Sequence, residues 1–340
     1  MSDIVKSSLT ALIAGERPSP SAIQACFTAI MDGDVGEAQM AAFLIALKMR
    51  GEQVDDIAAA ASVMRNKALT IQASDDAMDI VGTGGDGFGT YNISTASAFV
   101  IAGCGIPVAK HGNKAVSSKS GAADVLSALG IKLDCDMALV ERALAEANIA
   151  FLMAPRHHAA MRHVAPVRAA LGVRTIFNLL GPLSNPALVK RIMVGVFDQS
   201  YCAPFAHVLA RLGTSHAWVV HGADGLDEVS TTGKTHVAAL VDGKVSEFTI
   251  SPEDIGLPTA RLDQLRGGDG DHNARYLRAL LEGETGPYHD IVLFNAAAAL
   301  VAGGHVADIQ QGAEMAEESI DSGKALAALD GLIAITNGKA

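Results

Sequence analysis

The chain has 340 residues, 49% of them hydrophobic and 19% charged, which excludes a mainly disordered protein and leaves room for two domains. Its 26 Lys and Arg against 37 Asp and Glu give a formal net charge of −11. Because nucleic acids and anionic membranes are bound through a basic excess, this balance argues against both as general partners.

The four cysteines, Cys26, Cys104, Cys135 and Cys202, lie far apart and form no CxxC pair. We therefore expect free thiols and neither a disulfide framework nor a zinc site. The N-terminus lacks the basic and apolar regions of a signal peptide, and the longest apolar stretch, residues 291–304, is too short to span a bilayer. These features predict a cytoplasmic location.

Apolar residues recur at helical spacing through the first 70 residues. The spacing predicts helices over residues 4–13, directly after 18–21, between Gly36 and Gly51, and over 54–67. The third helix carries an apolar face made of Met40, Phe43, Leu44 and Leu47. With this face the bundle has more apolar surface than four short helices can bury among themselves. We therefore predict a small helical domain, residues 1–71, through which two copies form a symmetric homodimer.

From residue 78 onward the pattern changes to short apolar strands that alternate with helices. Strands are predicted at 79–81, 106–109, 191–196 and 217–220, with a hairpin of 236–240 and 245–250 around Asp242-Gly243. Helices are predicted at 94–103, 136–147, 202–212, 273–282, 290–302 and 307–322. Strand, glycine loop, helix and strand make a βαβ unit, so we expect an α/β domain over 72–340 whose mostly parallel central sheet is flanked by helices.

The strongest functional signal begins at Gly82, where five of eight residues are glycine and a helix start follows. Backbone N–H groups of such a loop converge on a phosphate, and the helix N-terminus adds to them. Gly82, Gly84 and Gly87 match the dinucleotide fingerprint, which also expects an acidic residue about 20 positions on. The chain offers Lys110 and His111 there instead, which excludes the NAD interpretation.

Two further loops follow predicted strands. Residues 110–121 hold three lysines, three serines and an asparagine, a composition typical of polyanion binding. Asp227 and Glu228 are expected in a surface loop. Such a pair suits a Mg²⁺ ion that is bound together with substrate phosphates. Asp86 in the glycine loop fits beside such a metal. Because ligands bind at the carboxyl ends of parallel strands, we expect the three loops to form a site for a metal-chelated polyphosphate.

A cationic stretch, residues 155–186, contains three histidines and four arginines. An arginine here could bind a carboxylate through two parallel hydrogen bonds. A basic face that covers the acidic small domain explains the composition equally well, and both interpretations stay open.

Taken together, these motifs resemble the anthranilate phosphoribosyltransferase family over nearly the full chain. The resemblance rests on GTGGD at 82–86, NIST at 92–95, KHGN at 110–113, SSKSG at 117–121, the Asp227-Glu228 pair and residues 174–186. It implies transfer of the phosphoribosyl group from 5-phosphoribosyl 1-diphosphate to the amine of anthranilate, in tryptophan biosynthesis. It also implies two Mg²⁺ ions per subunit, a homodimer, and a segment near 170–185 that rejoins the helical domain.

The resemblance further implies roles for individual residues. Donor contacts are implied for Gly82, Gly85, Asp86, Thr90, Asn92, Ile93, Ser94, Thr95, Lys110, His111, Gly112, Asn113, Lys114, Ala115, Val116, Ser117, Ser118 and Ala122. Ser94, Asp227 and Glu228 are implied for Mg²⁺, and Gly82, Asn113 and Arg168 for anthranilate, with His111 and His158 along its path. Lys114 and Ala122 depart from the family, whose members often carry arginine and serine there.

No side chain is named as nucleophile or general base. Diphosphate departure needs charge stabilisation and a well-placed acceptor amine, which is uncharged at neutral pH. Two alternatives stay open: a pyrimidine nucleoside phosphorylase, which would have no need of the acidic pair, and a non-catalytic nucleic-acid-binding protein on the same fold, which would need a basic surface.

Overall fold

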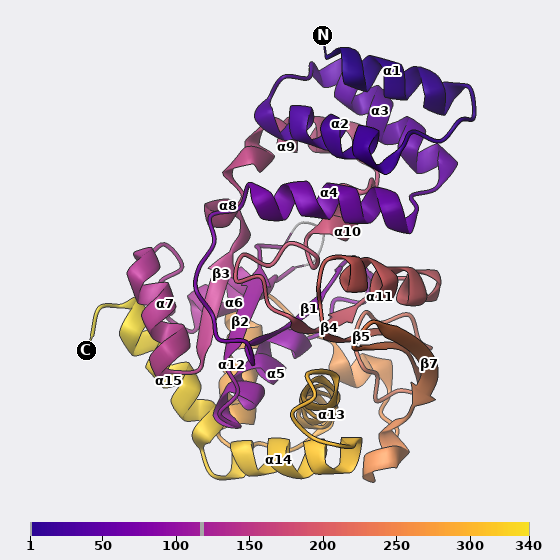
Figure 1. Ribbon diagram of the computed structural model, residues 1–340. Coiled ribbons are helices and arrows are strands. Elements are labelled where there is room, and N and C mark those ends of the chain that lie inside the picture. The colour runs from indigo at the N-terminus through magenta and orange to yellow at the C-terminus, as the bar shows by residue number, and fades with distance from the viewer. Residues whose placement is uncertain (1, 116–118, 340) are drawn as a thin grey trace.

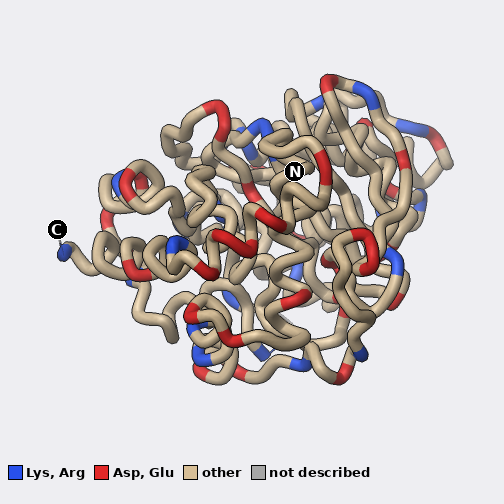
Figure 2. Tube along the Cα trace, turned by 90° about the horizontal axis from the view of Figure 1, so that it is seen from below, with Lys and Arg blue, Asp and Glu red and all other residues tan. Residues whose placement is uncertain are grey.

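The computed structural model describes residues 2–115 and 119–339. A helical bundle at the N-terminal end sits over an α/β part that is built on one seven-stranded sheet (Figure 1). Among the described residues no helix is both long and apolar enough to cross a bilayer. Acidic and basic residues are interspersed along the trace in the view from below (Figure 2).

The four predicted N-terminal helices are confirmed to within a few residues: α1 (Asp3–Ile13), α2 (Pro20–Asp32), α3 (Glu37–Arg50) and α4 (Val54–Asn66). Their ends follow local chemistry. The Ser19 hydroxyl accepts a hydrogen bond from the Ala22 N–H at the start of α2, and α2 ends at Gly33, whose φ of 83° favours glycine.

A later part of the chain completes this bundle: η1 (Ala159–His163), α9 (Ala165–Leu171) and α10 (Phe177–Leu180), which follow the short helix α8 (Ala154–His157). Helix α9 packs on α3, and α10 packs on α4. The ring of Phe177 meets that of Phe27 edge-on, with centroids 5.7 Å apart. The later segment therefore shares the hydrophobic core of the bundle.

This packing corrects one sequence argument. Met40, Phe43, Leu44 and Leu47 are all buried within a single chain, where the expectation placed part of their surface against a second copy. The added helices supply the apolar partners that the four N-terminal helices lack. These four residues therefore give no support to a dimer, which stays a prediction.

The sheet has the strand order β3-β2-β1-β4-β5-β6-β7. The strands are β1 (Met78–Gly82), β2 (Val108–Gly112), β3 (Ile149–Met153), β4 (Arg191–Gly195), β5 (His216–Gly222), β6 (Thr235–Val241) and β7 (Lys244–Ile250). The first five run parallel, while β6 and β7 form the predicted antiparallel hairpin, in which Asp242 and Gly243 both have positive φ.

Two sequence-based strand assignments need correction. Strand β3 was not predicted, because five consecutive apolar residues do not distinguish a buried strand from a helix. Strand β2 begins and ends later than predicted, so Lys110, His111 and Gly112 are its last three residues and not the start of a loop. Their positions are fixed by backbone pairing to β3.

Helices cover both faces of the sheet (Figure 1). On the side away from the bundle lie α5 (Ile93–Gly103), α13 (Pro287–Ala302) and α14 (Ile309–Asp321), and on the bundle side lies α11 (Cys202–Arg211). The remaining helices are α6 (Ala122–Ala128), α7 (Met137–Glu146), α12 (Gly270–Leu281) and α15 (Lys324–Thr336), of which α6 and α15 were not predicted. Alternate strand residues divide between two cores, so Met193 packs with α13 while Val194 packs with α11 and the bundle.

The strand order places a topological switch point between β1 and β4. The chain leaves β1 toward β2 on one side and leaves β4 toward β5 on the other, so the connections diverge at the carboxyl ends. Gly82 and Gly195, the last residues of these two strands, are register partners. Ligands of open parallel sheets bind in the crevice at such a point.

We predict that Phe177→Ala lowers the free energy of urea unfolding by about 3–5 kcal/mol, because the ring fills the bundle core beside Phe27. The exposed Val173 in the same segment provides the control, and Val173→Ala should change that free energy by less than about 0.5 kcal/mol. Equal effects of the two substitutions, followed by circular dichroism, would show that the segment is not part of the bundle core.

Candidate active site

At the switch point the structure packs one carboxylate against two glycines. A Cβ atom on Gly82 would collide with the Asp227 carboxylate, and one on Gly195 with the Asp227 carbonyl oxygen. The carboxylate accepts a hydrogen bond from the N–H of Gly84 at 2.6 Å. The glycines at these strand ends are therefore needed to admit Asp227, which links the acidic pair to the glycine loop.

Asp227 is buried and Glu228 is half-buried, unlike the surface pair that the sequence suggested. Asp227 is 7% exposed, and the Glu228 carboxylate accepts a hydrogen bond from the Ser94 N–H at 3.2 Å. Burial, together with the charge of Asp86, raises the pKa of Asp227 to about 7. Burial and the charge of Asp227 raise the pKa of Glu228 as well. A bound cation would favour the ionised forms of Asp227 and Glu228 and so stabilise this arrangement.

Lys110 supplies positive charge beneath this cluster. It is 3% exposed, and its Nζ donates to the Ile80 carbonyl at 2.7 Å and to the Ser94 hydroxyl at 3.3 Å. Its charge opposes the rise in the pKa of Glu228. The Lys110 side chain thus extends from β2 below the glycine loop to the start of α5. Its charge reaches the acidic pair through the low-dielectric interior of the protein.

A buried network supports this arrangement from below. Asp79 in β1 accepts hydrogen bonds from the His111 N–H at 3.3 Å and from the Asn185 side chain at 2.7 Å. Burial raises the pKa of Asp79 to about 6 even though Lys110 opposes the shift. The Asn185 amide also donates to the Ala109 carbonyl at 2.7 Å, so it ties β1 to β2.

The described ends of the basic loop are held together by Asp124. Its carboxylate accepts hydrogen bonds from the N–H groups of Ala115 at 2.9 Å and Gly121 at 2.8 Å. Asn113 and Lys114 are exposed at the end of β2, and Ala122 begins α6. The predicted donor residues Val116, Ser117 and Ser118 lie outside the described residues.

The start of α5 joins the glycine and basic loops. The Asn92 side chain donates to the Ser120 carbonyl at 3.4 Å and accepts from the Asn273 amide at 2.9 Å. Of the predicted donor residues here, Ile93 and Thr95 are each 1% exposed, so their side chains face the core and leave only their backbone for a ligand. Asn273 was missed by sequence reasoning, because nothing in its local pattern distinguishes it from other helix residues.

Two neutral histidines lie beside the end of β2. The rings of His111 and His158 meet edge-on with centroids 5.1 Å apart. Burial lowers the pKa of His111 to about 3 and that of His158 to about 4, so both rings are uncharged near neutral pH. Among the described residues the buried Nε2 of His111 has no hydrogen-bond partner.

The cationic stretch contributes two arginines of different kinds. Arg168 on α9 is half-buried, and among the described residues it has no side-chain hydrogen bond or ion pair. Arg174 donates to the Gly85 carbonyl and stacks on Phe197 with its guanidinium carbon 4.0 Å from the ring centroid. Sequence reasoning gave Arg174 no individual role, and only the fold shows that it reaches the glycine loop.

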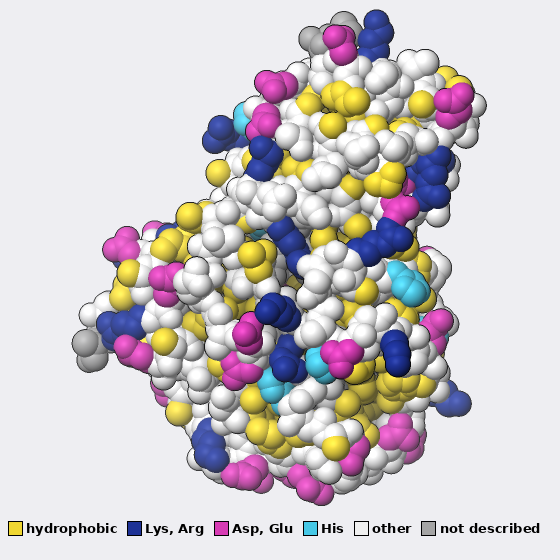
Figure 3. Space-filling model, viewed as in Figure 1, with side chains coloured by type: hydrophobic (Ala, Val, Ile, Leu, Met, Phe, Trp, Pro, Cys, Tyr) yellow, Lys and Arg dark blue, Asp and Glu magenta, His cyan; other side chains and the backbone are white. Residues whose placement is uncertain are grey.

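These contacts bring the glycine loop, the described ends of the basic loop and the acidic pair to one edge of the sheet. Lys and Arg side chains also gather at the waist below the bundle (Figure 3). Among the described residues no three His, Cys, Asp or Glu side chains form a ready metal cage. Mg²⁺ fits this donor set, because it binds through one or two carboxylates and takes its other oxygens from substrate phosphates and water.

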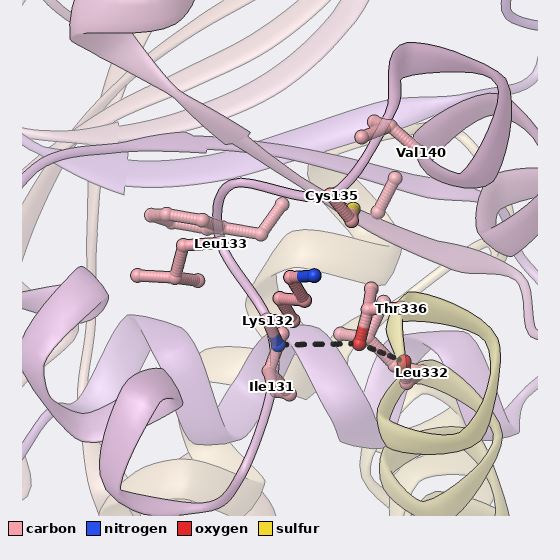
Figure 4. A pocket seen from close by; sticks show the side chains of 9 residues that line it. Ile131, Lys132, Leu133, Cys135, Val140, Leu332 and Thr336 are labelled. Atoms are coloured by element: carbon pink, nitrogen blue, oxygen red, sulfur yellow. Dashed lines mark hydrogen bonds between the residues drawn. The ribbon is translucent and has the colours of Figure 1, made fainter. Parts of the chain in front are cut away.

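The cavity in Figure 4 belongs to another part of the molecule. It measures about 10 Å³, room for about one water, and lies between α7 and α15. The Thr336 hydroxyl on its wall accepts from the Lys132 N–H at 3.3 Å and donates to the Leu332 carbonyl at 2.7 Å. None of the predicted site residues lines it.

Comparison with known proteins agrees with this geometry. Residues 74–326 match the model of the glycosyl transferase family a/b domain, and residues 6–68 match its helical bundle domain. The chain is 58% identical to an anthranilate phosphoribosyltransferase of Rhodospirillum rubrum, over 96% of this chain and 94% of the relative.

Two solved structures of anthranilate phosphoribosyltransferases share the fold. The Thermus thermophilus enzyme is 42% identical with a TM-score of 0.92, over 97% of this chain and 99% of that one. The Saccharomyces cerevisiae enzyme, in complex with PRPP and Mg, is 30% identical with a TM-score of 0.91, over 99% of each chain. The chain belongs to the anthranilate phosphoribosyltransferase family.

Proposed function

We propose that this chain transfers the 5-phosphoribosyl group from 5-phosphoribosyl 1-diphosphate to the amine of anthranilate, releasing diphosphate, as a step of tryptophan biosynthesis. The observation that carries the proposal is the Asp227–Glu228 pair, with Asp227 buried against the glycine ends of β1 and β4 beside the glycine loop. The similar proteins are anthranilate phosphoribosyltransferases, and the complex of the yeast relative with PRPP and Mg agrees with the proposal.

In this proposal the donor's phosphates lie against backbone N–H groups of the glycine loop, the start of α5 and the basic loop. The donor residues are those that the family resemblance implies. Lys110 acts from below through its charge, and Arg174 holds the glycine loop through the Gly85 carbonyl. Lys114 supplies a point charge where relatives often have a planar guanidinium.

Ser94, Asp227 and Glu228 would hold Mg²⁺, for which we propose two ions per subunit. Bound Mg²⁺ supplies charge neutralisation for the departing diphosphate. The chain's own part is to keep the acidic pair in place, through the Gly84 N–H on Asp227 and the Ser94 N–H on Glu228. A nucleoside phosphorylase, the first alternative, would have no need of this pair.

For the acceptor we propose Gly82, Asn113 and Arg168, with His111 and His158 along its path. The half-buried Arg168 has no described partner, which leaves its guanidinium available for the anthranilate carboxylate. The two histidines are uncharged near neutral pH and so do not compete for that carboxylate. The acceptor amine is uncharged too, so positioning it behind the anomeric carbon is the main requirement.

We also propose two domains, a helical one of residues 1–71 with the segment near 170–185 and an α/β one of the rest. The boundaries of the two family models and the packing of α9 and α10 on the bundle support this division. The four cysteines are free, which supports the expected reducing cytoplasm.

Arg168→Ala should reduce kcat/KM for anthranilate by about 30- to 150-fold, because it removes a charged two-point contact worth about 2–3 kcal/mol. The KM for the donor should change little. Arg168→Lys should recover only part of the loss, because it keeps the charge without the planar fork. The exposed Arg162 of the same stretch gives the control, Arg162→Ala. If Arg168→Ala changes the KM for the donor and not that for anthranilate, the proposed acceptor site is wrong.

The double variant Asp227→Asn, Glu228→Gln should lose Mg²⁺-dependent turnover and yet unfold at a higher temperature than the wild type without Mg²⁺. At pH 8, above the pKa of about 7 for Asp227, the wild type must hold an ionised carboxylate in a buried site, so we expect a gain of about 1 kcal/mol or more from its removal. The gain should shrink as the pH falls below 7, because Asp227 of the wild type then becomes protonated.

Asp242→Asn, which removes a carboxylate from the exposed hairpin turn, serves as the control for that double variant. It should change neither turnover nor melting temperature appreciably. Full Mg²⁺-dependent turnover in the double variant would exclude the acidic pair as the metal site.

We propose a homodimer through the helical domain, now on different residues. Ile13 at the end of α1 and Met49 near the end of α3 are 75% and 83% exposed. The double variant Ile13→Glu, Met49→Glu should be monomeric by light scattering at micromolar concentration, while the wild type is dimeric. Val241→Glu, an equal change at an exposed position in the sheet, should leave the dimer intact. A monomeric wild type would refute the proposal.

A further inference from the structure

One side chain in the core of the α/β part differs in kind from its surroundings. Asn295 lies in the middle of α13, fully buried, in a helix whose other buried residues are almost all apolar. A buried amide costs free energy unless its polar atoms are paired. The partners of this amide therefore indicate why the position is polar.

Both ends of the Asn295 amide bond to the backbone of a single residue, Val229. The Val229 N–H donates to Oδ1 at 2.9 Å, and Nδ2 donates to the Val229 carbonyl at 2.7 Å. The second hydrogen of Nδ2 goes to the Ile291 carbonyl, one turn earlier in α13, at 2.8 Å. The amide thus pairs with Val229 as a neighbouring strand would, and no donor is left over for a ligand.

Val229 directly follows Glu228, in a part of the loop that forms neither helix nor strand. Val229 is 0% exposed, so without Asn295 its N–H and carbonyl would lie buried and unpaired. The next residue is held in the same way, since the Ser230 N–H donates to the Thr235 hydroxyl at 2.9 Å. Side chains take the place of sheet pairing in this segment.

The contacts of the acidic pair depend on the position of this segment. The Asp227 carboxylate accepts from the Gly84 N–H at 2.6 Å and the Glu228 carboxylate from the Ser94 N–H at 3.2 Å, and a loop free to shift at Val229 would lose both contacts. We propose that Asn295 is a positioning residue for the Mg²⁺ site, which fixes the Asp227–Glu228 pair by bonding both polar groups of Val229. This inference rests on the proposed metal-binding function of the pair.

The test is calorimetric titration of inorganic diphosphate and Mg²⁺ into the whole protein, with Asn295→Leu compared with the wild type. The Mg²⁺ concentration for half-maximal diphosphate binding should rise about tenfold or more, the typical effect of losing a group that orients a metal ligand. The KM for anthranilate should change less than about twofold, because the acceptor groups are elsewhere.

Ser319→Ala is the matched control. Ser319 is 2% exposed and donates to the Val100 carbonyl at 2.7 Å, so it joins α14 to α5 through a buried hydrogen bond away from the acidic pair. It should lower the melting temperature without moving the Mg²⁺ midpoint. If the leucine variant does not fold, Asn295→Ser, which puts one shorter hydroxyl in place of the amide, replaces it in the same titration.

A double-mutant cycle between Asn295→Leu and Glu228→Gln separates positioning from ordinary core packing. Asn295 bonds both backbone groups of Val229, the neighbour of Glu228, so substitutions at 295 and 228 act on one segment and their melting-temperature changes should not add. Additive changes together with an unmoved Mg²⁺ midpoint would overturn the role of Asn295. Wild-type diphosphate binding that is indifferent to Mg²⁺ would instead overturn the proposed metal site itself.

Discussion

The constraint on which the site depends is the placement of three like charges where two parallel strands diverge. Asp227 fits across the ends of β1 and β4 only because Gly82 and Gly195 have no side chains. Burial beside Asp86 and Glu228 makes ionisation costly for the pair, so the folded chain without metal holds a strained charge distribution. In the proposed function a metal-chelated diphosphate would relieve that cost, so donor binding would also stabilise the folded chain.

Buried polar side chains keep this charge cluster in place. Lys110 brings one cation to the start of α5, and Asn185 fixes β1 to β2 through Asp79 and the Ala109 carbonyl. Asn273 orients Asn92 in the same manner. Each amide pairs with backbone or side-chain groups that would otherwise be buried without a hydrogen-bond partner. The network therefore fixes the positions of the loops.

The helical bundle is connected to the site by a chain segment that belongs to both. Helices α9 and α10 pack on α3 and α4, while Arg174 between them reaches the glycine loop at Gly85. Arg168 lies on α9 in the same segment. A displacement of the bundle would therefore move Arg174 at the glycine loop and the proposed acceptor residue Arg168 together. The position of the bundle would thus affect where both substrates lie.

The sequence by itself determined the helical and α/β parts, the hairpin at Asp242-Gly243, and the identity of the three loops, because glycine clustering, periodicity and charge are local properties. It could not reveal strand β3, whose five apolar residues suit a helix or a strand equally well. Nor could it show that Asp227 is buried, that Lys110 lies inside β2, or that Arg174 reaches Gly85. Those facts follow from which strands become neighbours and from how helices distant in sequence, such as α13 with Asn295, pack against a loop. Tertiary structure decided them because burial and pairing are properties of neighbours in space, and neighbours more than 60 residues apart leave no trace in local pattern.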